Sequence, residues 1–312
     1  MLKVNSTLTS LNLSYNNISE NGAKEITAAL KDNSTLTSLY LYCNNIGENG
    51  AKEIAAALKD NSTLTSLYLY CNNIGENGAK EIAAALKVNS TLRTLDLYDT
   101  NIGENGAKEI AAALKVNSTL TSLNLNCNNI GENGANEIAE MLKDNSTLTS
   151  LSLYDTNIGK NGAKKIAAAL KDNSTLRTLD LGDNKIYDSG AKELIEMLED
   201  NYTLTEFNRF RNQISKNNIE LINSYVKRNK RIDDLVKEKI TAKTIVLEKD
   251  LKIEWQTELN AQIRIEKLTT FENIVAKMSA KLKDDINIGK KDKDIIQNSL
   301  KKIINKVQKI IR

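Results

Sequence analysis

A unit of 28 residues repeats along most of the chain and constrains its fold more than any other feature. The first copy, NSTLTSLNLSYNNISENGAKEITAALKD, begins at Asn5. The later copies follow without insertion and begin at Asn33, Asn61, Asn89, Asn117, Asn145, Asn173 and Asn201. Eight copies therefore occupy residues 5–228 of the 312 residues. A strict period of this length is typical of a solenoid, in which each repeat packs against its neighbours.

Two hydrophobic patterns predict the local structure of each copy. Leu11 and Leu13 alternate with polar residues, as in a short strand with one buried face. Ala23, Ile26 and Leu30 lie three and four residues apart, which places them on one face of a helix. Stacked copies can bury both rows in a continuous core. We therefore expect parallel strands along one side and helices along the other, and because helices are wider than strands, the strand side should be concave.

The pattern L-x-x-L-x-L-x-x-N-x-I, seen in the copy beginning at Asn33 as Leu36, Leu39, Leu41, Asn44 and Ile46, resembles leucine-rich repeats. The 28-residue length with a full helix resembles the ribonuclease-inhibitor class, which is also found in Ran GTPase-activating proteins and NOD-like receptors. The resemblance implies an α/β horseshoe-shaped solenoid over the eight copies. It does not imply a partner, because function in this class lies in the variable surface positions.

The asparagine of this motif recurs after most strands, at Asn16, Asn44, Asn72, Asn128, Asn184 and Asn212. Its amide both donates and accepts, as the backbone groups of a buried turn require. Thr100 and Thr156 replace it in the fourth and sixth copies. A hydroxyl can satisfy only part of that demand, so we predict a local irregularity there but no break in the array. The Asn-Ser-Thr sequence that opens the copies is expected to form the helix-to-strand turn.

The two ends of the array depart from the repeat. Residues 2–4 repeat the Leu-Lys-Val that closes an interior helix at 114–116, which favours a truncated or fragmentary N-terminus. In the eighth copy, Phe207 and Arg209 replace core leucines, and Asn218 replaces the glycine near the start of the helix. Terminal repeats turn a polar face outward. We therefore expect a capping repeat and an end of the array near residue 228.

Residues 229–312 form a second predicted region, a basic helical tail. Residues 1–204 contain 18 Lys and Arg against 25 Asp and Glu, whereas residues 205–312 contain 25 against 15. Two apolar stripes at helical spacing comprise Leu268, Phe271, Val275, Met278 and Leu282, and Ile296, Leu300, Ile303, Val307 and Ile310. The leading interpretation is a small helical bundle. The alternatives are a dimerising coiled coil and a basic last helix that contacts nucleic acid or an anionic membrane.

Composition argues against an enzyme. The chain has no histidine, which removes the commonest general base and a common zinc ligand. Its three cysteines, Cys43, Cys71 and Cys127, are too few for a disulfide framework and have no basic activator nearby in sequence. We predict no catalytic residue, cofactor or metal site. The cysteine usage, together with the lack of a signal peptide or of an apolar run long enough for a transmembrane segment, favours a cytoplasmic location.

Residues that alternate with the buried leucines should point away from the core, onto the concave face. They change from copy to copy, from tyrosines in copies two to four to aspartates in copies four to seven. We predict that the partner-binding residues are Tyr40, Tyr42, Tyr68, Tyr70, Tyr98, Tyr154, Asp96, Asp99, Asp155, Asp180 and Asp183. The spacing of the aspartates does not match a calcium loop. The predicted function is a scaffold that binds another protein, possibly one with a basic surface, on this face; the alternative is an activator of a small GTPase, as the resemblance to Ran GTPase-activating proteins implies.

Overall fold

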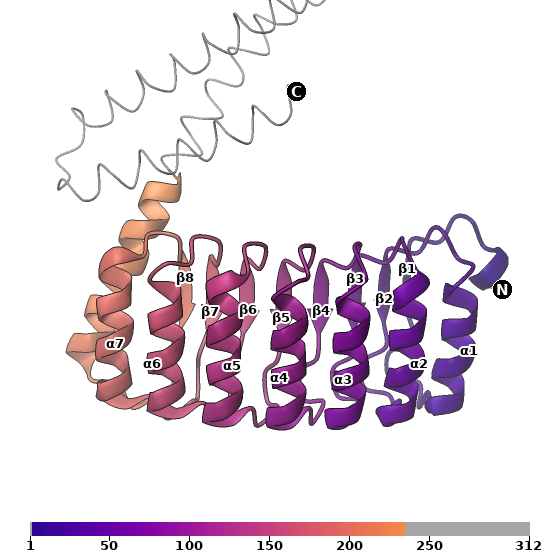
Figure 1. The fold of residues 1–312 in the computed structure, drawn as a ribbon, viewed down its shortest axis with the longest axis horizontal. Helices are drawn as coiled ribbons and strands as arrows, with labels where there is room; N and C mark the ends of the chain where they lie inside the picture. The colour runs from indigo at the N-terminus through magenta and orange to yellow at the C-terminus, as the bar shows by residue number, and fades with distance from the viewer. Residues whose placement is uncertain (1, 235–312) are drawn as a thin grey trace, which may run out of the picture. The chain divides into compact units, whose positions relative to one another are not determined.

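Strand and helix alternate in every copy of the repeat (Figure 1). The computed structural model describes residues 2–234, so both apolar stripes of the predicted tail and its basic last helix lie outside the described residues. The strands are β1 (Ser10–Asn12), β2 (Ser38–Tyr40), β3 (Ser66–Tyr68), β4 (Thr94–Asp96), β5 (Ser122–Asn124), β6 (Ser150–Ser152), β7 (Thr178–Asp180) and β8 (Glu206–Asn208). The helices are α1 (Glu20–Leu30), α2 (Gly47–Asp60), α3 (Gly75–Leu86), α4 (Gly103–Leu114), α5 (Gly131–Asp144), α6 (Gly159–Leu170) and α7 (Tyr187–Asp200), with a short 3-10 helix at Leu2–Val4 and further helix over residues 216–234.

The eight strands form one parallel sheet in chain order. Each residue pairs with the residue 28 positions away, as Leu11 does with Leu39, so equivalent side chains stack in straight columns. The helices lie side by side along the other face, as Figure 1 shows. A slip of one residue would turn the leucines outward, and the buried pattern therefore fixes the register. The α/β solenoid predicted from the repeat is confirmed.

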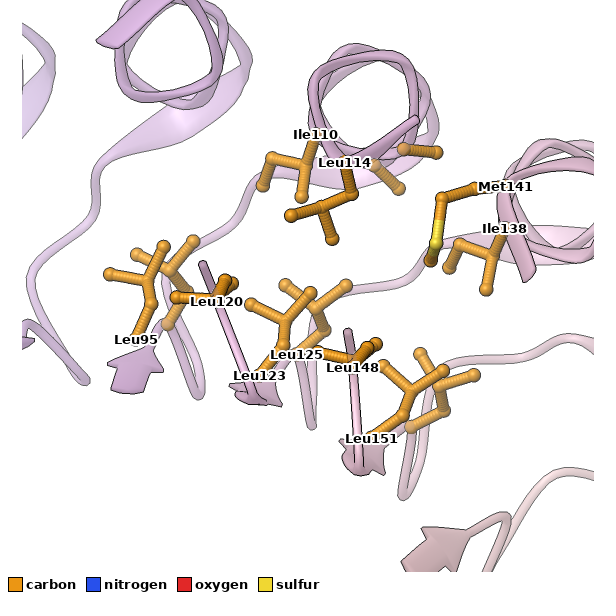
Figure 2. Close-up of a cluster of buried hydrophobic side chains, with 14 of the residues drawn as sticks. Leu95, Ile110, Leu114, Leu120, Leu123, Leu125, Ile138, Met141, Leu148 and Leu151 are labelled. Atoms are coloured by element: carbon orange, nitrogen blue, oxygen red, sulfur yellow. The ribbon is translucent and has the colours of Figure 1, made fainter. Parts of the chain in front are cut away.

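The core is a continuous row of leucines covered by apolar helix residues (Figure 2). Leu95, Leu123 and Leu151 stack on successive strands, each at most 2% exposed. Ile110 and Leu114 of α4 face this row from the helix layer. In the first copy the equivalent leucines are only partly buried. Interior copies thus obtain their burial from neighbours on both sides.

Neighbouring helices approach closely at the glycine in the first turn of each interior helix. A Cβ atom at Gly78 would lie 2.9 Å from the Cβ of Ala51 on α2 and 2.5 Å from Cγ2 of Ile74. Such contacts are too short for real carbon atoms, so this position requires glycine.

Buried asparagines connect each turn to the copy before it. Asn128 is 2% exposed, and its amide donates to the carbonyls of Leu97 at 2.7 Å and Leu125 at 3.0 Å. Its Oδ1 accepts from the backbone N–H of Thr100 at 3.1 Å and of Ile102 at 3.2 Å. From the second copy on, the asparagines of this motif form a ladder in which each satisfies polar groups of two copies.

The predicted irregularity at Thr100 affects hydrogen bonds and not the sheet. The Thr100 hydroxyl contacts the carbonyl of Leu97 at 2.7 Å and Oδ1 of Asn128 at 3.2 Å. The asparagine at this position in the preceding copy, Asn72, instead reaches back a whole repeat to the Leu41 carbonyl. Strand pairing on both sides of β4 continues in register. Threonine therefore weakens one link between copies while the array stays intact.

The Asn-Ser-Thr sequence forms the helix-to-strand turn, as predicted. Oδ1 of Asn89 accepts from the N–H groups of Thr91 at 3.0 Å and Leu92 at 2.8 Å. Its amide donates to the Leu58 carbonyl at the end of α2, in the second copy, at 2.8 Å. Because Asn89 is only 6% exposed, these bonds account for its presence.

The eighth copy ends the array with polar contacts. Asn229 stands where a ninth copy would begin, is buried, and donates to the carbonyls of Asn201 at 2.9 Å and Leu204 at 2.8 Å. The Arg228 guanidinium lies 3.8 Å from the centre of the Tyr202 ring. Further along the same helix, Asp233 forms an ion pair with Arg177. These contacts fit a capping repeat, and they continue past residue 228; the boundary predicted there stays a prediction.

Among residues 2–234, no helix combines the length and the apolar character that crossing a membrane requires.

Candidate protein-binding face

Three columns of side chains cover the concave face of the sheet. The first contains Asn12, Tyr40, Tyr68, Asp96, Asn124, Ser152, Asp180 and Asn208. The second contains Ser14, Tyr42, Tyr70, Tyr98, Asn126, Tyr154, Gly182 and Phe210. The third, in the turn after each strand, contains Tyr15, Cys43, Cys71, Asp99, Cys127, Asp155, Asp183 and Arg211. Every predicted site residue belongs to one of these columns, which the strand register holds side by side.

The tyrosines of copies two to four form a tyrosine cluster on adjacent columns, within which the ring contacts fall into two groups. Tyr40 and Tyr68 stack with ring centres 4.5 Å apart and planes at 1°. Tyr42 and Tyr70 stack at 4.1 Å and 8°. The cluster is extended by edge contacts, at 5.5 Å between Tyr15 and Tyr42 and at 6.2 Å between Tyr70 and Tyr98. Tyr15 was not among the predicted site residues, although its place in the third column was visible in the sequence.

Burial raises the pKa of two tyrosines of this cluster, Tyr68 and Tyr70. Desolvation raises the pKa of Tyr68, and the neighbouring Tyr40 adds to the effect. Desolvation also raises the pKa of Tyr70, with a contribution from its hydrogen bond to Tyr42. The Tyr68 and Tyr70 hydroxyls therefore stay neutral at physiological pH and present both a donor and an acceptor beside a large apolar surface.

Acidic and amide residues of the first column play the same local role. Asp96 accepts from the backbone N–H of Tyr98 at 3.0 Å, and Asn124 accepts from that of Asn126 at 3.1 Å. Asp180 does the same for Gly182 at 2.8 Å. Because either residue type satisfies the turn, the fold does not require a negative charge in this column. Desolvation raises the pKa of Asp96, so its charge is present at a cost.

The third column lies at backbone positions with positive φ, 50° at Asp99 and Asp155 and 56° at Cys71. Asp99 and Asp155 are exposed, and Asp183 is half-buried. The Cys71 thiol donates to Oδ2 of Asp99 over 3.7 Å. Burial, the adjacent Cys43 and the Asp99 charge raise the pKa of Cys71 to about 12. This thiol is protonated at neutral pH and is not an activated nucleophile.

An arginine, Arg211, lies at the C-terminal end of the concave face. Arg211 donates to the Tyr154 hydroxyl at 3.2 Å and forms an ion pair with Asp183 at 3.5 Å. The Tyr154 hydroxyl in turn donates to Asp183 over 3.3 Å. A Cβ at Gly182 would lie 2.7 Å from Cδ2 of Tyr154, so the glycine leaves room for the ring. Arg211 was not among the predicted site residues, because the eighth copy was expected only to cap the array. The 28-residue spacing from Asp183 to Arg211 was the available signal.

Metal binding finds no support on this face or elsewhere in residues 2–234, where no three Cys, Asp or Glu side chains are grouped to hold an ion.

Comparison with protein families matches the repeats directly. A family model described as "Leucine Rich repeat" matches residues 4–26, 32–55, 60–83, 88–111, 116–139, 144–167 and 172–194. The chain belongs to the leucine-rich-repeat family. The length and strand-helix composition of its units are consistent with the ribonuclease-inhibitor class. The family is generally one of binding scaffolds, which fits a face whose residues vary between copies.

Comparison with solved structures gives matches of low sequence identity, whereas no curated protein matches the chain. The leucine-rich-repeat protein LegL7 from Legionella pneumophila is 22% identical, with a TM-score of 0.50 over 72% of this chain and 73% of its own. Actin-binding site 2 of leiomodin-1 is 21% identical, with a TM-score of 0.44 over 64% of this chain and 96% of its own. The tropomodulin C-terminal domain of Caenorhabditis elegans is 12% identical, with a TM-score of 0.39 over 60% and 97%. At these identities the likeness concerns the fold alone.

Proposed function

We propose that this leucine-rich-repeat protein is a non-enzymatic scaffold in the cytoplasm whose concave face binds another protein. The observation that carries the proposal is the contrast between columns: core positions hold the same residue in almost every copy, whereas the concave columns change. Since the fold accepts several residue types there, the choice of tyrosine and aspartate reflects something outside the fold. Tyrosine offers a large contact area at a low entropic cost and is typical of interface anchors.

Charge on the face favours a partner with a basic surface. In the first seven copies, the three columns contain Asp96, Asp99, Asp155, Asp180 and Asp183 and no lysine or arginine. Arg211 of the eighth copy is the cation at the end of the third column. Complementary charge accelerates association and selects against acidic partners.

The test removes contact area without opening the core. Affinity purification of the full chain followed by mass spectrometry identifies the partner, and binding is then measured for the double variant Tyr42→Ala, Tyr70→Ala. Because the leucines behind these residues already fill the core, folding should change little. Binding should weaken by about 2 kcal/mol or more, as truncated interface aromatics often show. Tyr187→Ala is the control, since Tyr187 is exposed at the start of α7 and outside the three columns.

Two other outcomes would replace the proposal. If the main partner is a small GTPase and the chain accelerates its GTP hydrolysis, the protein is instead an activator of that GTPase, as the resemblance to Ran GTPase-activating proteins implies. Alternatively, the tyrosine pair could prove neutral while deletion of residues 235–312 abolishes binding. In that case the tail, with protein, nucleic acid or anionic membrane as its target, would be the binding region. This deletion retains Asn229 and Asp233, which contact the last repeats.

A further inference from the structure

The contact at the C-terminal end of the concave face shows how the face holds a guanidinium group. Tyr154 of the sixth copy, Asp183 of the seventh and Arg211 of the eighth meet there. A single guanidinium nitrogen of Arg211, Nη1, donates to the phenol oxygen and pairs with the carboxylate, and these two groups are hydrogen-bonded to each other. This nitrogen carries two N–H groups, so it can face both acceptors while the rest of the planar guanidinium remains available for other contacts.

The same tyrosine and carboxylate recur three copies earlier. Tyr70 and Asp99 occupy the second and third columns of successive copies, as Tyr154 and Asp183 do. The residue equivalent to Arg211 is Cys127, whose side chain carries no guanidinium. Asp99 is exposed and, within residues 2–234, forms no ion pair; its contact from the Cys71 thiol is 3.7 Å long. The Tyr70 hydroxyl is hydrogen-bonded to Tyr42 and, within residues 2–234, not to Asp99. The same two residue types therefore lie in the middle of the face without an arginine beside them.

The surroundings of Tyr70 and Asp99 differ from those of Tyr154 and Asp183 in a further residue. Gly182 lies beneath the Tyr154 ring, whereas the equivalent residue of the fourth copy is Tyr98. The Tyr98 ring stands at 72° to that of Tyr70, with centres 6.2 Å apart. A cation at Asp99 would thus meet aromatic rings as well as a carboxylate. Arginine stacks on aromatic rings more readily than lysine does.

We propose that Tyr70, Tyr98 and Asp99 receive an arginine side chain of the protein partner, in the manner in which Tyr154 and Asp183 receive Arg211. The inference rests on the proposed function and specifies the chemistry that the partner presents at one point of the face. The Asp99 carboxylate pairs with the guanidinium of the partner, and the Tyr70 hydroxyl accepts a hydrogen bond from it. The Tyr70 and Tyr98 rings contact the flat face of the guanidinium.

The first test uses two labelled peptides as probes for the full chain. One alternates arginine with glycine, and the other replaces every arginine with lysine, so length and charge are equal. Fluorescence anisotropy should show several-fold tighter binding of the arginine peptide, because a planar guanidinium can stack on the Tyr70 and Tyr98 rings while it pairs with the carboxylate, whereas an ammonium group cannot stack. Asp99→Asn should weaken the arginine peptide by about tenfold and remove most of the preference. Asp172→Asn removes one exposed charge outside the three columns and should leave the preference unchanged.

The second test exchanges the residues that distinguish the two places. Cys127→Arg supplies the chain's own guanidinium next to Asp99 and should block the arginine peptide about as much as Asp99→Asn does. Asn136→Lys is the matched charge control, because it adds one positive charge to the same copy on α5, where α4 and α6 carry Lys108 and Lys164. Arg211→Cys frees Asp183 and Tyr154 and should strengthen binding of the arginine peptide.

The inference is overturned if the two peptides bind equally and Cys127→Arg acts no more strongly than Asn136→Lys. That result is distinguishable from failure of the proposed function. If Tyr42→Ala with Tyr70→Ala releases the partner while Asp99→Asn and Cys127→Arg do not, the face binds protein without an arginine at this point. If all of these variants retain the partner, the concave face is not the binding surface.

Discussion

The inner and outer sides of one strand follow different rules. Leu123 points into the core, is 2% exposed and has leucine at the equivalent position of every other copy except the eighth, which has Phe207. Asn124 is the next residue, and its column contains asparagine, tyrosine, aspartate and serine. The inner residue is constrained by neighbours on three elements, whereas the outer one needs only to fit a half-exposed strand. Stability should therefore depend on the inner side and recognition on the outer side.

The strongest test of this division is Leu123→Ala. The side chain lies between Leu95 and Leu151, beneath the helices (Figure 2). Removing it should lower the free energy of unfolding by about 2 to 5 kcal/mol, as buried leucines do. Denaturant titration measures the change. A loss below about 0.5 kcal/mol would show that the residue is not in the core.

Asn128→Ala tests whether a buried polar residue contributes to stability as the buried leucines do. The substitution leaves the carbonyls of Leu97 and Leu125 and the N–H groups of Thr100 and Ile102 without their partner. Buried groups deprived of partners cost about 1 to 3 kcal/mol, so we expect a loss in that range or slightly above it. The control is Asn133→Ala on the exposed face of α5, which should change stability by no more than about 0.5 kcal/mol. Equal effects of the two variants would contradict a structural role for the ladder.

Thr100→Asn should act in the opposite direction. The substitution restores an amide that can reach the preceding copy, as Asn72 reaches the Leu41 carbonyl. Because the strands on both sides of Thr100 are already in register, no rearrangement is needed. We expect a gain of about 0.5 to 1 kcal/mol in the free energy of unfolding, the value of one hydrogen bond. A loss of stability would mean that the site is shaped for the threonine methyl group.

The buried side of the strands could be predicted from the sequence, whereas the side-chain contacts on the exposed side could not. Identical core residues at a fixed spacing defined the strands, their register and the columns. Only one register buries the leucine of every copy, so a strict repeat leaves no alternative pairing. The predicted site residues therefore share a face. Contacts between long side chains were not predictable, since they depend on rotamers and on local space. The Arg211 contact needs the room left by Gly182, and the tyrosine stacks need rings turned parallel.

The substitution Asp96→Asn should have the smallest effect. It tests how much the Asp96 charge, on the exposed side of the strand, lowers the free energy of unfolding. Asn12 and Asn124 occupy the same column and accept the same turn hydrogen bond, so the amide should keep the contact to the Tyr98 N–H. Desolvation raises the folded-state pKa of Asp96, which means that the folded protein holds this proton more tightly than the unfolded chain does. The contribution of Asp96 to stability therefore falls as pH rises through that pKa.

At pH 7 the Asp96→Asn variant should accordingly be more stable than the wild type, by less than about 1 kcal/mol because solvent still reaches the carboxylate. The difference should shrink as the pH falls through the raised folded-state pKa and should be lost below about 4, the ordinary pKa of an aspartate. Thermal unfolding across this range measures it, with Asp172→Asn, an exposed change outside the columns, as the reference. A gain at pH 7 accompanied by weaker binding of a basic partner would show that the carboxylate at this position serves recognition at the expense of stability. A pH-independent difference would instead attribute the effect to packing.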